Sequence, residues 1–447
     1  MDFLKYARDN EKQFLKDLEE LLKIDTVLVE QPEVKEAPFG YNLVKALDYM
    51  LKLGEKEGFI TKNIDNVAGH IEYGEGEEII GVLSHLDVVP TGDGWKYPPF
   101  EPVVEDGKIY ARGALDDKGA CIACLYALKA LKENGVKLNK KVRLIYGTDE
   151  ETGSRGIARY LQVEKMPDLG FSPDADYPII YGEKGILSFV LESNTINEEI
   201  ISFESGDRLN VVPEVATVEL KNNYQKQFLD FINEKNYKGE VKDNKYIMYG
   251  KRAHAMEPRN GENALLRLVE FLNTIIEDKF IKYIYNNFRC SRLNTMNENF
   301  TDPEMGDLTS NVALMKISQG KGQLGINFRY PINWQKEKFF SNLKELSNES
   351  NIIVKVLGDS TPHYVSKEDE LVKTLHKSYI KYTGDDKTPL LTIGGGTYAR
   401  SMKRAVAFGP MMPGREDVVH QVNEYAYIED LLVSIAIFAD AIKELGK

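Results

Sequence analysis

The chain has 447 residues, of which 42% are hydrophobic and 28% charged, and its 57 basic and 70 acidic side chains give a formal net charge of −13. This composition is typical of a globular protein and excludes disordered, collagen-like and disulfide-framed chains. The acidic balance argues against general binding to nucleic acid or to an anionic membrane, because both require a positive surface. At about 150 residues per domain, the length suggests two or three domains.

Helix and strand patterns alternate along residues 1–182. Helix patterns cover Asp2–Lys23, Tyr41–Glu57 and Lys118–Glu133, and apolar strand patterns cover Glu78–Ser84, Lys141–Tyr146 and Leu169–Ser172. Short apolar strands between helices indicate an α/β domain with a mostly parallel sheet flanked by helices. In such a sheet, functional loops leave the carboxyl ends of the strands.

The middle of the chain has a different pattern of predicted helices and strands. Strand alternation covers Ile186–Leu191, Ala216–Leu220 and Gly325–Arg329, and helix patterns cover Tyr224–Phe231 and Ala264–Ile276. The alternation of helix and strand seen in residues 1–182 then returns, with helices at Glu368–Tyr382 and Ile428–Leu445 and a strand at Ala405–Phe408. We therefore expect a catalytic domain formed by residues 1–182 and 362–447, with an α+β lid domain, residues 183–361, inserted between them.

Cys121, Cys124 and Cys290 form an odd, sparse set that is typical of a reducing compartment. Cys121 and Cys124 make a C-x-x-C inside a helix pattern of small and apolar residues, which favours core packing over redox chemistry. The N-terminal segment has no uninterrupted apolar run, and no window approaches the 18 or so apolar residues of a membrane span. A cytoplasmic location is expected.

Four polar clusters lie in the predicted loops at one edge of the sheet. They contain His85 with Asp87, Asp116 with Asp117, Asp149 with Glu150 and Glu151, and Asp174 with Asp176. Because strand side chains alternate, His85 and Asp87 face the same way, and Asp87 can orient the imidazole. Each cluster alone is typical of a solvated loop, and an aspartate at a helix start is also a common N-cap.

Together the clusters supply a histidine and at least four carboxylates. So many acids would repel one another and raise their own pKa values unless a cation neutralised them. Histidine with carboxylates, and without thiolates, suits zinc, cobalt or manganese in a catalytic site better than calcium or structural zinc.

The other histidines divide into two groups. His420 follows a strand and a Gly/Pro loop and can reach the same sheet edge, whereas His254 lies in the inserted domain and would have to reach across a cleft. His70 and His376 are expected at the surface, and His363 is expected to have a structural role.

Five segments resemble the signature of the dizinc aminoacylase and carboxypeptidase family of metallopeptidases. They are His85-Leu-Asp87, Gly113-Ala-Leu-Asp116-Asp-Lys-Gly119, Asp149-Glu150-Glu151, Pro173-Asp174-Ala175 and the late His420, in the family's order along nearly the whole chain. Phe171-Ser-Pro-Asp-Ala, Gly394-Gly-Gly-Thr-Tyr-Ala-Arg400 and Met412-Pro-Gly-Arg-Glu-Asp417 are similar to the peptidase V branch of bacterial dipeptidases.

The resemblance implies two zinc ions per subunit, with cobalt or manganese as substitutes. The implied ligands are His85 and Asp174 for one ion and Glu151 and His420 for the other, with Asp116 bridging them. Glu150 would be the general base, and Asp87 would orient His85.

The resemblance also implies substrate-binding residues. In the lid, Asn210, His254 and Arg329 match such positions; His254 would stabilise the oxyanion and Arg329 would hold the substrate's terminal carboxylate. Gly395 and Thr397 lie in a Gly-rich loop without the strand and helix setting of a nucleotide site. This loop would present backbone N–H groups to the substrate.

The function implied by the resemblance is that of a zinc-dependent dipeptidase acting on unblocked dipeptides, including carnosine-like Xaa-His substrates. N-acyl amino-acid deacylation or carboxypeptidase action by the same machinery is the alternative, because lid contacts decide which amide is cut. An inactive metal- or peptide-binding module is disfavoured, since every implied ligand and Glu150 are of the required type. The long insertion implies that one chain supplies the whole site, so a monomer is expected.

Overall fold

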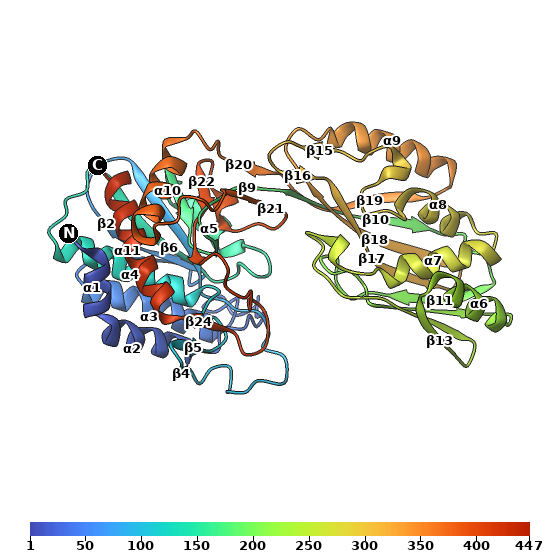
Figure 1. Ribbon diagram of the computed structural model, residues 1–447, viewed down its shortest axis with the longest axis horizontal. Helices are drawn as coiled ribbons and strands as arrows, with labels where there is room; N and C mark the ends of the chain where they lie inside the picture. The colour runs from blue at the N-terminus through green and yellow to red at the C-terminus, as the bar shows by residue number, and fades with distance from the viewer. The chain divides into compact units, whose positions relative to one another are not determined.

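The computed structural model describes residues 1–447 and divides into two compact units (Figure 1). The first unit consists of Met1–Gly182, Tyr364–Leu391 and Gly396–Lys447, and the second of Glu183–His363 with Thr392–Gly395. The second boundary therefore lies two residues beyond the expected one. None of the helices combines the length and apolar character that a bilayer-crossing segment requires.

Besides that two-residue shift, the structure moves the short segment Thr392–Gly395 from the expected catalytic domain to the second unit. The backbone N–H of Lys184 donates to the carbonyl of Ile393 at 2.9 Å, and Arg329 Nη1 donates to the carbonyl of Gly394 at 2.8 Å. Both donors belong to the second unit. These hydrogen bonds explain why the segment belongs to the second unit. Their donors are remote in sequence, so a local sequence pattern could not predict them.

Most helices of the first unit match the predicted patterns; the exceptions are the N-terminal segment and the helix Arg155–Val163, which no predicted pattern covers. They are α1 (Phe3–Asp9), α2 (Glu11–Leu22), α3 (Tyr41–Lys56), α4 (Lys118–Glu133), α5 (Arg155–Val163), α10 (Glu370–Thr383) and α11 (Ile428–Leu445), with the 3-10 helix η3 (Tyr398–Ser401). The single helix expected over Asp2–Lys23 is wrong, because Asn10 ends α1. Its side-chain amide donates to the carbonyl of Tyr6 at 2.9 Å, a local bond typical of asparagine at helix ends.

A nine-stranded sheet forms the centre of the first unit, in the order β1-β2-β6-β3-β7-β22-β9-β20, with β21 paired to β9. The strands are β1 (Ile60–Ile64), β2 (Ala68–Tyr73), β3 (Ile79–His85), β6 (Lys141–Gly147), β7 (Leu169–Ser172), β9 (Ile180–Glu183), β20 (His363–Tyr364), β21 (Leu391–Ile393) and β22 (Ala405–Ala407). The four central strands β6, β3, β7 and β22 run parallel, and antiparallel strands flank them on both sides. The parallel core confirms the predicted α/β class.

Two smaller sheets complete the first unit. They are formed by β4 (Val103–Glu105), β5 (Lys108–Tyr110) and β24 (Tyr425–Tyr427), and by β8 (Ala175–Asp176) with β23 (Pro410–Met411). In each of these sheets, a strand from the first 182 residues pairs with a strand from the last part of the chain. The two sheets therefore connect loops that follow the central strands.

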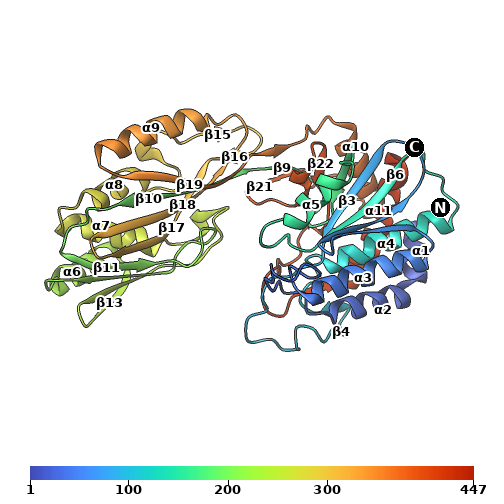
Figure 2. The ribbon, with the colours of Figure 1, turned by 180° about the vertical axis from the view of Figure 1, so that it is seen from behind.

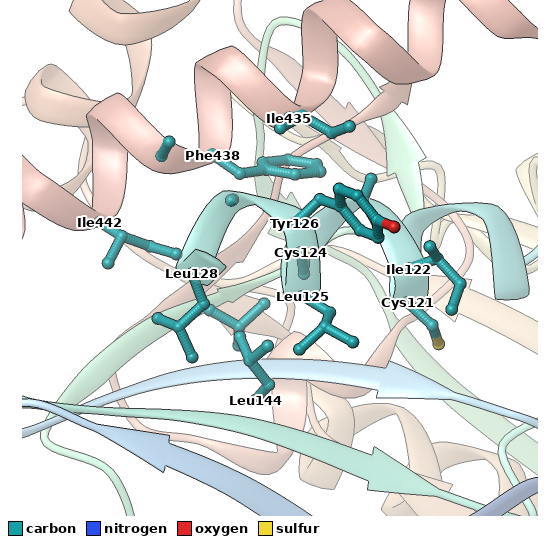
Figure 3. Packing of buried hydrophobic residues seen from close by; sticks show 14 of the residues in the cluster. Cys121, Ile122, Cys124, Leu125, Tyr126, Leu128, Leu144, Ile435, Phe438 and Ile442 are labelled. Carbon is teal, nitrogen blue, oxygen red and sulfur yellow. The ribbon is translucent and has the colours of Figure 1, made fainter. Parts of the chain in front are cut away.

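The central strands supply side chains to cores on both faces of the sheet. Val82 and Leu144 lie in the larger core with α1–α4, α10 and α11, whereas their neighbours Leu83 and Ile145 lie in a smaller core with α5 and η3. This division follows from the alternation of strand side chains. Helix α4 is buried between α11 and the sheet (Figure 3).

The C-x-x-C pair lies in this core. Cys121 and Cys124 are fully buried in α4 as free thiols, among the apolar side chains that Figure 3 shows. Burial raises the pKa of both thiols well above its ordinary value, which keeps them protonated and unreactive. The prediction of core packing is confirmed.

The second unit is an α+β domain, as predicted, with one eight-stranded antiparallel sheet in the order β13-β14-β12-β11-β17-β18-β10-β19. Its strands are β10 (Gly185–Ser193), β11 (Ile200–Ser205), β12 (Val215–Leu220), β13 (Lys238–Lys242), β14 (Lys245–Tyr249), β17 (Thr309–Ser318), β18 (Lys321–Tyr330) and β19 (Ile353–Ser360), with β15 (Thr301–Asp302) and β16 (Gly306–Asp307) as a separate pair. Its helices are α6 (Gln225–Lys235), α7 (Ala264–Ile275), α8 (Lys279–Phe288) and α9 (Lys336–Glu349), with the 3-10 turns η1 (Pro258–Asn260) and η2 (Asn294–Met296).

Alternation along β10 shows how this sheet is covered. Leu187, Phe189 and Leu191 are buried, and the residues between them are only partly covered. The buried face packs against the helices: α7 and α8 lie in front of the strands in Figure 1 and behind them in Figure 2. One face of the sheet therefore forms the core, as expected of a half-covered antiparallel sheet.

His70 is buried, so the expectation of a surface position is wrong. The residue lies on β2 and is 3% exposed, and its Nδ1 lies 2.8 Å from the hydroxyl of Tyr160 on α5. The polar residues that suggested exposure are themselves paired, since Arg143 forms an ion pair with Glu72 at 2.7 Å. Burial, together with the charge of Arg143, lowers the pKa of His70 to about 4 from 6.5.

We expect His70 to make the free energy of unfolding fall in acid. The unfolded chain protonates this imidazole near pH 6.5 and the folded chain only near pH 4, so the unfolded state binds more protons between these values. Stability is therefore unaffected above pH 6.5 and decreases by up to about 3 kcal/mol as the pH falls to about 4. Urea denaturation in the presence of a chelator, across this pH range, would measure the loss.

A His70→Gln variant is the control for this prediction. It should show a flatter pH dependence than the wild type, while the charged neighbours Lys62, Glu72, Arg143 and Glu164 are the same in both proteins. The same dependence in both proteins would contradict the assignment to His70.

Candidate active site

Six side chains converge at the carboxyl edge of the parallel strands. His85 is the last residue of β3, Asp116 precedes α4, Glu150 and Glu151 follow β6, Asp174 follows β7, and His420 lies between β23 and β24. All six belong to the first unit. The loops that the sequence places at this edge thus meet in the structure.

His85, Asp116 and Asp174 form the first donor group. His85 Nε2 lies 2.9 Å from Asp116 Oδ1 and 3.7 Å from Asp174 Oδ2. The ring's Nδ1 lies 2.9 Å from the carbonyl oxygen of Asp87, and because a carbonyl only accepts, Nδ1 carries a proton. In the neutral ring, the lone pair of Nε2 therefore points toward the two carboxylates.

Asp116, Glu151 and His420 form the second donor group. His420 Nε2 lies 2.9 Å from Glu151 Oε1 and 3.0 Å from Asp116 Oδ2. Asp116 thus belongs to both groups and turns one oxygen toward each histidine. In each group the possible ligand atoms lie within 4.8 Å of one another.

The charges at this edge are mutually repulsive. Burial, reinforced by the charge of Asp116, raises the pKa of Asp174 to about 6 and that of Glu151 to about 7. Burial also raises the pKa of Glu150 well above its ordinary value. Against the effect of burial, hydrogen bonds and charge from His420 and His85 in their protonated forms hold the pKa of Asp116 well below its usual range. A cation in each donor group would relieve this repulsion.

The donor set fits two divalent metal ions. Each group offers one imidazole and two carboxylates without a thiolate, which is the chemistry of catalytic zinc and related ions. Asp116 Oδ1 is buried and makes no hydrogen bond, so one oxygen of the shared residue remains for a ligand. Three protein ligands per ion would also leave coordination positions for water and substrate.

Asp87 supports this edge in a way that differs from the expectation. Its carboxylate lies 3.7 Å from His85 Nδ1, which is too long for a hydrogen bond, and the backbone carbonyl of Asp87 orients the ring instead. The two carboxylate oxygens accept the backbone N–H groups of Glu150 and Glu151, each at 3.0 Å. The buried Asp87 side chain therefore fixes the turn that carries both glutamates.

Three buried side chains border the donor groups without a role predicted from the sequence, which placed Asp117 only in a polar cluster. Asp117 accepts the backbone N–H of His85 at 3.1 Å, and Arg112 pairs with Glu424 at 2.7 Å. Arg112 precedes the Gly113–Gly119 motif, and Glu424 follows His420, so both lie beside predicted ligands. Their pairing could not be read from the sequence, because 312 positions separate them.

The residues expected to bind substrate lie mainly in the second unit. Asn210 and His254 are exposed neighbours, since the carbonyl of Asn210 accepts the N–H of Ala255 at 2.8 Å. Nδ1 of His254 accepts the backbone N–H of Met256 at 3.1 Å, which orients the ring. In the neutral form the ring proton is then on Nε2.

Arg329 and the Gly-rich loop are linked by a direct contact. Arg329 is 4% exposed, and its guanidinium donates to Asn327 Oδ1 and to the carbonyl of Gly394, both at 2.8 Å. Gly395 belongs to the second unit with Arg329, whereas Thr397 belongs to the first. Thr397 Oγ1 accepts the N–H of Ala399 at 3.1 Å and caps η3.

The chain resembles known peptidases along most of its length. The model of Peptidase family M20/M25/M40 matches residues 81–444, which include both donor groups. The Bacillus subtilis protein named "Putative dipeptidase YtjP" is 44% identical, with 98% of each chain covered.

Two solved structures share the fold. Human carnosine dipeptidase 1 has a TM-score of 0.62 at 15% identity, covering 99% of this chain and 98% of its own. The Bacillus subtilis YxeP protein, described as a dinuclear metal binding peptidase, has a TM-score of 0.56 at 10% identity, covering 98% of this chain and 99% of its own. The family model and the 44% identical relative show that the chain belongs to the M20/M25/M40 peptidase family.

Proposed function

We propose that this metallopeptidase is a zinc-dependent dipeptidase that hydrolyses unblocked dipeptides, carnosine-like Xaa-His dipeptides among them. The observation that carries the proposal is the pair of donor groups that share Asp116. The dipeptide class of substrate is supported by the names of the 44% identical relative and of the carnosine dipeptidase that shares the fold.

In this proposal the ligands of one ion are His85, Asp116 and Asp174, and those of the other are Asp116, Glu151 and His420. Zinc suits this mixture of imidazole and carboxylate, and cobalt or manganese could replace it. When bound, two such ions would polarise the scissile carbonyl and lower the pKa of a water toward about 7.

Glu150 is the proposed general base. It belongs to neither donor group, yet it is adjacent to Glu151 and its backbone is fixed by Asp87. Glu150 would accept the proton of the attacking water and then deliver it to the leaving amine. Burial raises the pKa of its carboxyl, which supports this double role because a carboxyl of raised pKa holds the accepted proton more firmly before delivering it.

Residues of the second unit are proposed to recognise the substrate. His254 would donate its Nε2 proton to the oxyanion, as the bond from Met256 to Nδ1 supports. Arg329 would hold the terminal carboxylate in a forked ion pair. The remaining proposed contacts come from Asn210, Gly395 and Thr397.

Metal analysis combined with a substrate panel tests this function. We expect two metal ions per chain, loss of turnover on chelation, and recovery with zinc, cobalt or manganese. Unblocked dipeptides should be cleaved faster than N-acetylated amino acids. A preference for the acetylated compounds would identify a deacylase instead, and hydrolysis unaffected by chelation would overturn the metal mechanism.

We also propose that the enzyme acts as a monomer in the cytoplasm. The length of the inserted segment Glu183–His363 supports a site completed within one chain, and the free cysteines support a reducing compartment. Light scattering should give a mass near 50.7 kDa. A mass near twice this value, with activity lost on dissociation, would contradict the monomer.

A further inference from the structure

We propose that the buried Arg112–Glu424 ion pair positions Asp116 and His420 for metal binding. The inference rests on the metal centre of the proposed function. Arg112 lies between β5 and α4, and Glu424 lies directly before β24. Both side chains are 1% exposed, and Nη1 of the arginine lies 2.7 Å from Oε2 of the glutamate.

The second oxygen of Glu424 holds the loop that carries Asp116. Its Oε1 accepts the backbone N–H groups of Gly113, Leu115 and Asp116 at 3.1, 3.0 and 3.2 Å. Three N–H groups that converge on one oxygen form a site for an anion, and bonds to a charged acceptor are about twice as strong as neutral ones. The carboxylate therefore fixes the backbone at Asp116 itself.

Arg112 holds the segment that carries His420. Its Nη1 also donates to the carbonyl of Gln421 at 3.1 Å, and its Nη2 lies 3.5 Å from the carbonyl of His420. His420 has a φ of 63°, a left-handed conformation that is sterically unfavourable for a residue other than glycine. Such a conformation persists only where its surroundings hold it, and the guanidinium is bonded to the next residue.

The ion pair thus joins two segments that are more than 300 positions apart. One segment carries Asp116, which both donor groups share, and the other carries His420. The alternative to this positioning role is a general contribution to folding, because in many buried ion pairs the two residues only compensate each other's charge. The two roles have different consequences. A folding role changes the stability of the metal-free protein, whereas a positioning role changes the affinity for the metal.

The chain offers a matched control for this distinction. Arg143 and Glu72 form a largely buried ion pair, also 2.7 Å long, on the neighbouring strands β6 and β2. Neither residue contacts a member of the donor groups in the structure. A Glu72→Gln variant therefore removes a similar charge from the same unit without touching the proposed metal centre.

Zinc dissociation constants, measured by competition with a chelator, test the inference. Glu424→Gln should weaken zinc binding by about 10–100-fold, the usual effect of losing a residue that orients a ligand, and excess zinc should restore turnover. Arg112→Lys keeps the positive charge but loses the planar guanidinium, whose two nitrogens bond Glu424 and the segment of His420. This variant should therefore also weaken zinc binding. Glu72→Gln should bind zinc like the wild type, even if it unfolds at a lower temperature.

Unchanged zinc affinity in Glu424→Gln and Arg112→Lys, or an equal loss in Glu72→Gln, would overturn the positioning role. If Glu424→Gln does not fold, Arg112→Lys decides by the same criterion. A wild-type protein that binds no zinc, cobalt or manganese would refute the proposed function itself. The failure of the inference is therefore distinguishable from the failure of the function.

Discussion

Glu150→Gln should bind two metal ions like the wild type and yet lose roughly 10²–10⁴-fold in kcat, the usual contribution of a general base. Glutamine has the shape of glutamate but cannot accept a proton at neutral pH. Metal binding should persist, because Glu150 belongs to neither donor group. The backbone N–H of residue 150 should also still donate to Asp87, since the substitution leaves the main chain unchanged.

Metal stoichiometry and dipeptide turnover, measured on the same sample, check this expectation. Glu78→Gln is the control, because Glu78 has a largely exposed side chain at the other end of β3 from His85. This control should have wild-type turnover. Residual activity of Glu150→Gln within about twofold of the wild type would remove Glu150 from the role of base. Loss of metal would instead place it among the ligands.

The positions of the candidate ligands could be predicted because each follows a short apolar strand or begins a helix. His85 ends β3 and Asp174 lies two residues after β7, so strand prediction alone places them at one edge of a parallel sheet. The boundaries of α4 and α11 were predictable for the same local reason. Their apolar periodicity is long and uninterrupted.

Contacts between distant segments were not predictable. The carboxylate of Asp87 was expected to face His85, but it binds the N–H groups that follow β6, and only the structure shows this distance. His70 was expected at the surface because its neighbours are polar, yet Arg143 neutralises Glu72 beside it. In each case, a partner remote in sequence decides the role of the side chain.

Asp116→Asn should weaken the binding of both metal ions, whereas changes to the other carboxylate ligands should affect one ion each. Asp116 Oδ1 faces His85 at 2.9 Å and Oδ2 faces His420 at 3.0 Å, so the two donor groups depend on one carboxylate. An amide keeps one oxygen, but its nitrogen donates and cannot serve as a ligand. The substitution also removes the negative charge that both ions would share.

The metal content after dialysis distinguishes these variants. We expect about two ions per chain in the wild type, about one in Asp174→Asn and in Glu151→Gln, and less than one in Asp116→Asn, since each group has three candidate ligands. The affinity lost in Asp116→Asn should exceed the roughly 10–100-fold cost of losing a supporting residue, because a ligand itself is removed. Two ions retained by Asp116→Asn would show that the sites are independent, and the shared carboxylate would then not be the feature that couples them.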